Sequence, residues 1–134
     1  MNKLIHLIDF PNFTDERGTL VALESCKTIP FDIKRVYYLF DLKNGISRGF
    51  HAHKETRQVA ICLNGSCNIL MDDGQSRKTV KLDSPNKGLL IDVFQWHEMH
   101  DFTDDCILVV LASHLYLESD YIRNYDEFLE VVSK

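Results

Sequence analysis

Two histidines one residue apart are the first candidates for chemistry in this sequence. His51 and His53 lie in the stretch RGFHAHKETRQ, residues 48–58, which has the composition of an extended segment. In a strand, alternate side chains point to the same face, so both imidazoles project together, into a pocket or into solvent. Inside a pocket, such a pair either holds a metal ion or transfers protons, because imidazole is a nitrogen ligand with a pKa close to neutral.

The residues after the pair have the layout of the first cupin motif. Gln58 stands where that motif has an acidic ligand, and Gly65 stands at the glycine of its hairpin. A second histidine motif belongs on a later strand pair, and WHEM, residues 96–99, occupies that place. We therefore predict a barrel whose pocket is lined by His51, His53, Gln58 and His97.

Gln58 bears directly on metal binding, because it offers a neutral amide oxygen where a metal-binding cupin has a carboxylate. A site of three nitrogens from His51, His53 and His97 stays open. Without a metal, the paired imidazoles suit proton transfer to and from a weakly acidic carbon. A cationic neighbour such as Arg48 favours a neutral, basic ring and attracts an anionic substrate.

Short strand-like runs separated by turn signals make up most of the chain. Asn64-Gly65 and Asp73-Gly74 are typical of type I′ hairpin turns. In the tail, apolar residues follow helical spacing over residues 119–132, with Ser119 or Asp120 at the start and Asn124 as a point of division. This pattern predicts an all-β antiparallel barrel or sandwich with a short helix packed outside it. The predicted strands are 19–24, 34–42, 58–63, 66–71, 79–82, 88–93 and 107–112.

Composition narrows the classes of function. A net charge of −5 without a run of Lys or Arg argues against nucleic-acid binding. No apolar stretch approaches the ~20 residues of a membrane span, and the N-terminus lacks the pattern of a secretory signal, so we expect a cytoplasmic protein. The 134 residues contain no linker or repeat, which predicts one domain, residues 1–134. The four cysteines form no CxxC pair and are expected to be reduced.

Five segments of the chain share their residues and order with one group of proteins. They are RGFHAHK (48–54), QVAICLNGS (58–66), LMDDG (70–74), WHEM (96–99) and LVVLASHLYLESDYIRNYDEFL (108–129). Together they resemble the WxcM-like family of sugar-nucleotide 3,4-ketoisomerases, from about residue 5 to the end of the chain. The resemblance implies a cupin double-stranded β-helix (jelly-roll) barrel and an isomerase that needs neither a metal nor another cofactor.

The resemblance also implies a substrate and an assembly. Members of this family convert dTDP-4-keto-6-deoxy-D-glucose to a 3-keto-6-deoxyhexose, which an aminotransferase turns into a 3-amino sugar of O-antigens, S-layer glycans or antibiotics. They form homodimers that exchange N-terminal strands. Moving the carbonyl from C4 to C3 passes through an enediol(ate), for which one or two acid–base groups and a donor to the developing oxyanion suffice.

The expected catalytic residues follow from this chemistry. His51 is expected to be the principal base, and His53 the second proton carrier or orienting partner. Tyr38 is expected to donate to the enediolate oxygen, which would turn Tyr37 to the other face of the strand; alternation alone does not decide between the two.

The expected binding residues are mostly cationic. Arg17, which matches a family arginine near the pocket, and Arg48 are candidates for the diphosphate, because a guanidinium fork suits phosphate oxygens. Lys54 could equally contact the phosphate or point into solvent. The full set of predicted substrate-binding residues is Arg17, Arg48, Tyr37, Gln58, His97 and Lys54.

One segment departs from the family pattern. The family has a Pro-Pro or Pro-Gly turn before Trp-His, whereas this chain has IDVFQ, residues 91–95. We therefore expect a loop of different shape there. Two other functions remain as alternatives: a cupin sugar-nucleotide epimerase, and a non-catalytic module that binds a metal or a sugar.

Overall fold

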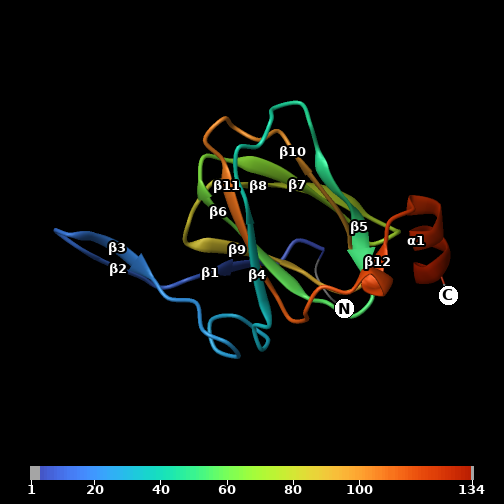
Figure 1. The fold of residues 1–134 in the computed structure, drawn as a ribbon, viewed down its shortest axis with the longest axis horizontal. Coiled ribbons are helices and arrows are strands. Elements are labelled where there is room, and N and C mark those ends of the chain that lie inside the picture. The colour runs from blue at the N-terminus through green and yellow to red at the C-terminus, as the bar shows by residue number, and fades with distance from the viewer. Residues whose placement is uncertain (1–3, 134) are drawn as a thin grey trace.

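Two five-stranded antiparallel sheets face each other in the structure, a computed structural model that describes residues 4–133 (Figure 1). The first sheet has the order β1 (Leu7–Asp9), β9 (Lys87–Ile91), β6 (Gln58–Asn64), β11 (Ile107–Ala112) and β4 (Arg35–Leu39). The second has the order β12 (Tyr121–Ile122), β5 (Arg48–His53), β10 (Trp96–His100), β7 (Cys67–Asp72) and β8 (Arg77–Leu82). The predicted jelly-roll barrel with a short C-terminal helix is confirmed.

The core lies between the sheets and continues over the outer face of the first one. Side chains of both sheets meet inside the barrel, among them Ile69, Met71 and Leu108. On the outer side of β6, Val59 and Ile61 pack against Ile29 and the chain that leads into β4. β6 is therefore buried on both faces, and this explains why its sequence is a nearly continuous apolar run.

The two predicted hairpin turns have different outcomes. Residues 64–65 do not close a hairpin, because β6 and β7 belong to different sheets and Gly65 (φ 68°) sits where the chain crosses between them. β7 and β8 do form a hairpin, with the turn at residues 73–76. A type I′ turn needs positive φ at two adjacent positions, whereas only Gly74 (φ 92°) has it in this loop.

The helical spacing predicted over residues 119–132 becomes a helix only after Asn124, the residue expected as a point of division. A 3₁₀ turn, η1 (Glu118–Asp120), leads into β12, which pairs with β5, and α1 (Tyr125–Val132) begins only after Asn124. The Asn124 side chain caps α1 by accepting a hydrogen bond from the Glu127 backbone N–H at 3.0 Å. Pairing with the edge of β5 gives the backbone of residues 121–122 its partners and places Tyr121 opposite His53.

Strands β2 (Asn12–Asp15) and β3 (Gly18–Val21) form a hairpin that projects away from the barrel (Figure 1). The strand predicted at 19–24 therefore ends earlier, and its partner was not predicted. The side chains of Phe13 and Leu20 on this hairpin are 65% and 59% exposed. None of the described helices is long and apolar enough to cross a membrane.

Candidate active site

Three imidazoles meet at the centre of the second sheet. His51 and His53 project from the same face of β5, and His97 on β10 is paired with His51 in the sheet register. The ring centroid of His51 lies 5.0 Å from that of His53 and 4.5 Å from that of His97. One nitrogen from each ring lies within 4.8 Å of the others, so the structure brings all three predicted histidines together.

A distortion of β5 directs His51 towards this cluster. Gly49 and Phe50 both have positive φ, 93° and 61°, and the pairing of β5 with β10 shifts register beside them. A Cβ atom at Gly49 would lie 3.1 Å from the His97 carbonyl oxygen and 3.2 Å from the Glu98 Cα. Only glycine tolerates both the conformation and the close approach of β10.

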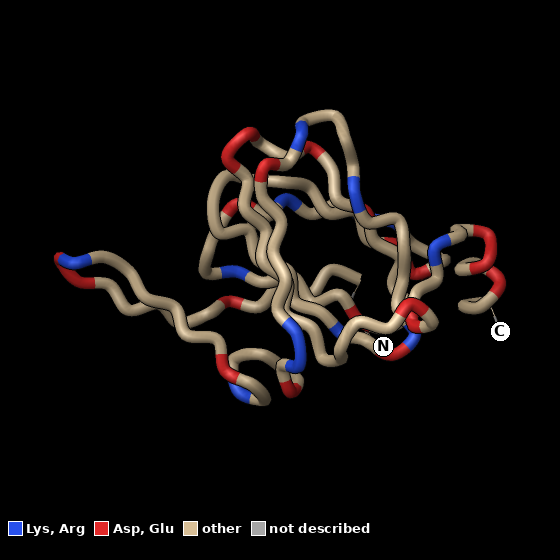
Figure 2. The backbone as a smooth tube through the Cα atoms, in the orientation of Figure 1, with Lys and Arg blue, Asp and Glu red and all other residues tan. Residues whose placement is uncertain are grey.

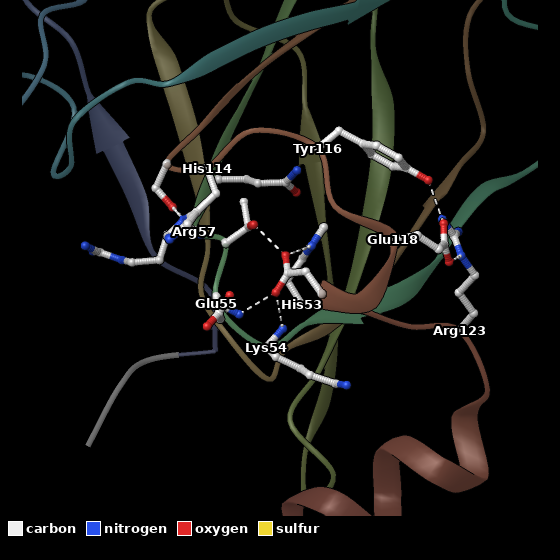
Figure 3. Close-up of polar contacts among 12 residues, drawn as sticks. His53, Lys54, Glu55, Arg57, His114, Tyr116, Glu118 and Arg123 are labelled. Carbon is white, nitrogen blue, oxygen red and sulfur yellow. Dashed lines mark hydrogen bonds and ion pairs between the residues drawn. The ribbon is translucent and has the colours of Figure 1, made fainter.

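The buried carboxylate of Asp120 holds His53 in one orientation. Asp120 Oδ2 accepts from His53 Nδ1 at 2.9 Å and from Thr56 Oγ1 at 2.5 Å. Its Oδ1 accepts from the backbone N–H groups of Lys54 at 3.0 Å and Glu55 at 2.6 Å (Figure 3). Nδ1 of His53 therefore carries a proton, and Nε2, with its lone pair free, has no hydrogen-bond partner among residues 4–133.

The environment keeps these rings neutral. The pKa of His51 is lowered to about 4, chiefly by burial; the Gly49 backbone opposes the shift and the neighbouring His53 adds to it. Burial also lowers the pKa of His53, although Asp120 opposes the shift, and it lowers the pKa of His97 well below the ordinary value. At neutral pH the cluster therefore contains imidazoles that can accept a proton.

Tyr37 is the tyrosine that faces this cluster, and the expectation for Tyr38 is corrected. Arg35, Tyr37 and Leu39 point inward from β4, whereas the Tyr38 side chain is 64% exposed on the outer face. Gln58 Nε2 donates to the Tyr37 hydroxyl at 2.8 Å, which leaves the phenol proton available to another acceptor. Burial raises the pKa of Tyr37 to about 12, so the phenol stays protonated and can act as a donor.

A cavity of about 350 Å³ opens in front of His51 and Tyr37. Three arginines border it: Arg35, Arg48 and Arg123. Arg123 lies over the Tyr121 ring, 4.2 Å from its centroid, and forms two 2.9 Å hydrogen bonds with Glu118 (Figure 3). The complete lining is Arg35, Tyr37, Leu39, Arg48, Gly49, His51, Met99, Tyr116, Tyr121 and Arg123.

Several buried polar atoms of this region have no hydrogen-bond partner among the described residues. They are Nε and Nη2 of Arg35, both ring nitrogens of His51, Nε2 of His53 and of His97, and Oε1 of Gln58. Buried polar groups are nearly always paired in folded proteins, so a concentration of unpaired donors and acceptors marks a place for a polar ligand. The same three imidazoles have the spacing of a three-nitrogen metal site.

Four predicted binding residues do not line this cavity. Gln58 and His97 are buried next to its lining residues Tyr37 and His51, whereas Arg17 and Lys54 are exposed elsewhere. Arg17 is at the tip of the projecting hairpin, 85% exposed, with its guanidinium paired to Asp15 at 2.5 Å. Lys54 is exposed, and Figure 3 shows its side chain extending away from His53; only its backbone N–H takes part in the site, through Asp120. Lys54 follows the end of β5, and its exposed side chain matches the alternative that it is solvated.

Four residues of the site were not predicted: Arg35, Asp120, Tyr121 and Arg123. Arg35 shares the face of Tyr37 by simple alternation, so the choice of Tyr37 over Tyr38 would have identified it. The other three lie in the SDYIRNYDEF segment, whose specific sequence was noticed but which was interpreted as a helix on the outside of the barrel. A strand bridge to β5 brings them to the histidines instead.

Known proteins share this sequence and architecture. The chain is 54% identical over 128 residues to the TDP-4-oxo-6-deoxy-α-D-glucose-3,4-oxoisomerase of Aneurinibacillus thermoaerophilus, covering 96% of this chain and 92% of that protein. A mutant of the 3,4-ketoisomerase QdtA from Thermoanaerobacterium thermosaccharolyticum in complex with TDP-4-keto-6-deoxyglucose matches with a TM-score of 0.95 and 44% identity, covering 99% and 96% of the two chains. A 3,4-ketoisomerase from Helicobacter canadensis matches with a TM-score of 0.94 and 48% identity over 97% and 98%.

The family model described as FdtA, WxcM-like, C-terminal matches residues 3–133, which is nearly the whole chain. The fold, the histidine cluster and this match lead to one conclusion: the chain belongs to the WxcM-like family that the five sequence segments indicated.

Proposed function

We propose that this protein is a sugar-nucleotide 3,4-ketoisomerase that converts TDP-4-keto-6-deoxyglucose to a TDP-linked 3-keto-6-deoxyhexose. The observation that carries the proposal is a set of neutral imidazoles beside a protonated tyrosine at a cavity bordered by three arginines. The relative at 54% identity is named as a TDP-4-oxo-6-deoxy-α-D-glucose-3,4-oxoisomerase. The similar QdtA structure is a complex with TDP-4-keto-6-deoxyglucose.

The residues support a reaction by proton transfer alone. A neutral imidazole, with His51 as the principal base, removes the proton from C3, and the electron pair forms a C3–C4 double bond while the C4 carbonyl becomes an enediolate oxygen. The Tyr37 hydroxyl, which accepts from Gln58, donates its own proton towards that oxygen. A proton then returns to C4, and the C3 hydroxyl loses its proton and becomes the carbonyl.

His53 is suited to the second transfer. Its Nδ1 proton is held by Asp120 at 2.9 Å, so the ring presents an unprotonated Nε2 next to His51. A proton accepted there gives an imidazolium that the buried carboxylate stabilises. His97 lies behind both rings, fully buried, and its Nδ1 contacts the Gln95 carbonyl oxygen at 3.2 Å.

The arginines are suited to the nucleotide diphosphate. Arg35, Arg48 and Arg123 border the same cavity and supply planar donors for phosphate oxygens. Nε and Nη2 of Arg35 are unpartnered in the described structure, so they can bind a ligand without breaking an existing hydrogen bond. We therefore assign diphosphate binding to Arg48, as predicted, and to Arg35 and Arg123 as well.

We further propose a homodimer in which the β2–β3 hairpin of each chain packs on the other. The hairpin exposes Phe13 and Leu20, and the outer face of β4 exposes Val36, Tyr38 and Phe40 by 55%, 64% and 59%. Two exposed apolar surfaces on one chain are what a self-complementary interface needs. In this dimer Arg17, at the hairpin tip, reaches the cavity of the partner chain. It could then bind the diphosphate there, although it lies far from the cavity of its own chain.

The test is the exchange of the substrate's C3 hydrogen with solvent deuterium, followed by NMR on chelator-treated protein and TDP-4-keto-6-deoxyglucose. A carbonyl shifted from C4 to C3 supports the proposal. His51→Asn should lower turnover by roughly 10²–10⁴-fold because the base is lost, whereas the matched His6→Asn change, at an exposed histidine, should not alter it. Absence of exchange refutes the proposal.

The same experiment separates the alternatives. A product with an inverted carbon and an unmoved carbonyl would identify an epimerase. A stoichiometric metal bound by His51, His53 and His97, without turnover, would identify a binding module. The proposal also includes one domain spanning residues 1–134 and a cytoplasmic location. The product would lead to a 3-amino sugar of an O-antigen or S-layer glycan.

A further inference from the structure

Three cysteines that are distant in sequence converge inside the barrel, away from the histidine cavity. Cys62 lies on β6 of the first sheet, Cys67 lies on β7 of the second, and Cys106 immediately precedes β11. Each is only 1% exposed. The Sγ atoms of Cys62 and Cys106 are 3.8 Å apart, and all three sulfurs lie within 4.8 Å of one another.

The backbone fixes these sulfurs. The chain crosses between the sheets at Gly65, whose φ of 68° and close neighbours leave no space for a side chain. The loop before β11 is tied to this crossing by Thr103, whose backbone N–H donates to the Ser66 carbonyl oxygen at 3.0 Å and whose hydroxyl accepts from the Ser66 N–H at 2.9 Å. The three thiols are therefore held close together before any ligand arrives.

The spacing and chemistry of the sulfurs select one kind of ligand. A metal with bonds of about 2.3 Å to sulfur places its sulfur ligands roughly 3.8–4.0 Å apart, so the cluster needs to contract by less than about 1 Å. In the described part of the chain no imidazole or carboxylate joins the group, whereas structural zinc sites have four ligands. Sulfur-only ligation with three donors suits a soft monovalent ion that binds few ligands.

We propose that Cys62, Cys67 and Cys106 form a three-coordinate site for a soft monovalent metal ion of the Cu(I) class. The ion binds through the three sulfurs and links the two sheets at the end of the barrel where β6 crosses to β7. Above it, the loop that leads into β11 carries exposed Asp101, Asp104 and Asp105, visible as an acidic segment in Figure 2. This negative charge raises the local concentration of cations at the surface beside the site.

The experiment is a titration of the reduced, metal-free full chain with Cu(I) under anaerobic conditions against a competing Cu(I) chelator. We expect one ion per chain, and X-ray absorption at the copper edge should show three sulfur neighbours at about 2.2–2.3 Å. Cys67→Ala should weaken the affinity by roughly tenfold or more, because one of three bonds is lost. The matched change Cys26→Ala, at the exposed cysteine, should leave it unchanged.

Several results would overturn the proposal. Nitrogen scattering at the copper edge would place the ion at the histidines, and this measurement on the parent protein stays decisive even if Cys67→Ala does not fold. Equal affinity in parent and Cys67→Ala, loss of affinity in Cys26→Ala, or Zn²⁺ that resists displacement by Cu(I) would each contradict the site. None of these measurements depends on the ketoisomerase reaction, so the two proposals fail separately.

Discussion

Burial sets the chemistry of the imidazoles at the level of single residues. His51, His53 and His97 all have pKa values below the ordinary one, and desolvation is the largest cause for each. The same effect raises the pKa of Tyr37 to about 12. Bases that stay unprotonated and an acid that stays protonated thus lie side by side, which is the division of roles that an enediolate mechanism needs.

The pKa of His51 predicts the acid limb of the activity. Its neutral form is the active base, so kcat/KM should fall only as the pH drops towards about 4, below the ordinary histidine value of 6.5. Above neutral pH the rate should stay constant until another group titrates. The measurement is the pH profile of kcat/KM for TDP-4-keto-6-deoxyglucose. An acid limb centred near 6.5 would show that burial does not control this base.

Asp120 is a positioning residue, and Asp120→Asn tests its role. Oδ1 is held by the backbone N–H groups of Lys54 and Glu55, so the new amide should keep its oxygen there and turn its NH₂ to His53. The ring then takes the other tautomer, with Nε2 protonated and unable to accept. By analogy with the aspartate of a serine-protease triad, kcat should fall by roughly 10²–10⁴-fold.

KM for the Asp120→Asn protein should change little, because Asp120 does not line the cavity. Thr56→Val is the matched control, since it removes another hydrogen bond to the same carboxylate and leaves the His53 contact in place. Equal losses of kcat in the two variants, or a change confined to KM, would contradict a role through the His53 tautomer. Circular dichroism establishes that each variant is folded.

At the level of elements, the bulged strand β5 and the tail bring the site together. The positive φ at Gly49 and Phe50 shifts the register against β10, and His51 follows directly. The tail adds β12 to the other edge of β5, so that Asp120 and Tyr121 come next to the histidines. α1 then covers this arrangement with Phe128, which is fully buried against Trp96 and Ile122.

Gly49→Ala should destabilise the protein and displace His51. Backbone strain alone costs about 1–3 kcal/mol, and the new Cβ also meets the backbone of His97 and Glu98. Gly45→Ala is the matched control, because Gly45 has a similar φ of 87° and no neighbour within 4 Å. Urea unfolding should show a larger loss at Gly49 than at Gly45, and turnover should fall only at Gly49. Equal effects would mean that strain rather than the approach of β10 constrains this position.

At the level of the whole molecule, the hairpin of residues 12–21 projects away from its own barrel (Figure 1). Its exposed Phe13 and Leu20 need a partner surface, and the outer face of β4 offers one. In the proposed dimer each active site contains residues of both chains.

Mixing two inactive variants tests this arrangement. Arg17→Ala lacks the hairpin arginine and His51→Asn lacks the base; if Arg17 acts in the partner's cavity, a mixed dimer contains one complete site. Statistical mixing after refolding should restore roughly a quarter of the parent activity. Either variant alone should stay low, and light scattering should report a dimer throughout. No recovery in confirmed mixed dimers would place Arg17 outside the partner's site.

The sequence by itself determined that His51 and His53 share a face, because side chains alternate along a strand with a period of two residues. The spacing of the strands and the layout of the two histidine motifs determined the barrel and the approach of His97. The resemblance of residues 108–129 to the family indicated that the tail matters for function. Only the tertiary structure decided that Tyr37 and not Tyr38 faces inward, that residues 121–122 form a strand, and that Asp120 holds His53. Those outcomes depend on which sheet edge is open and which face of β4 meets the core, and contacts between residues far apart in the chain set both.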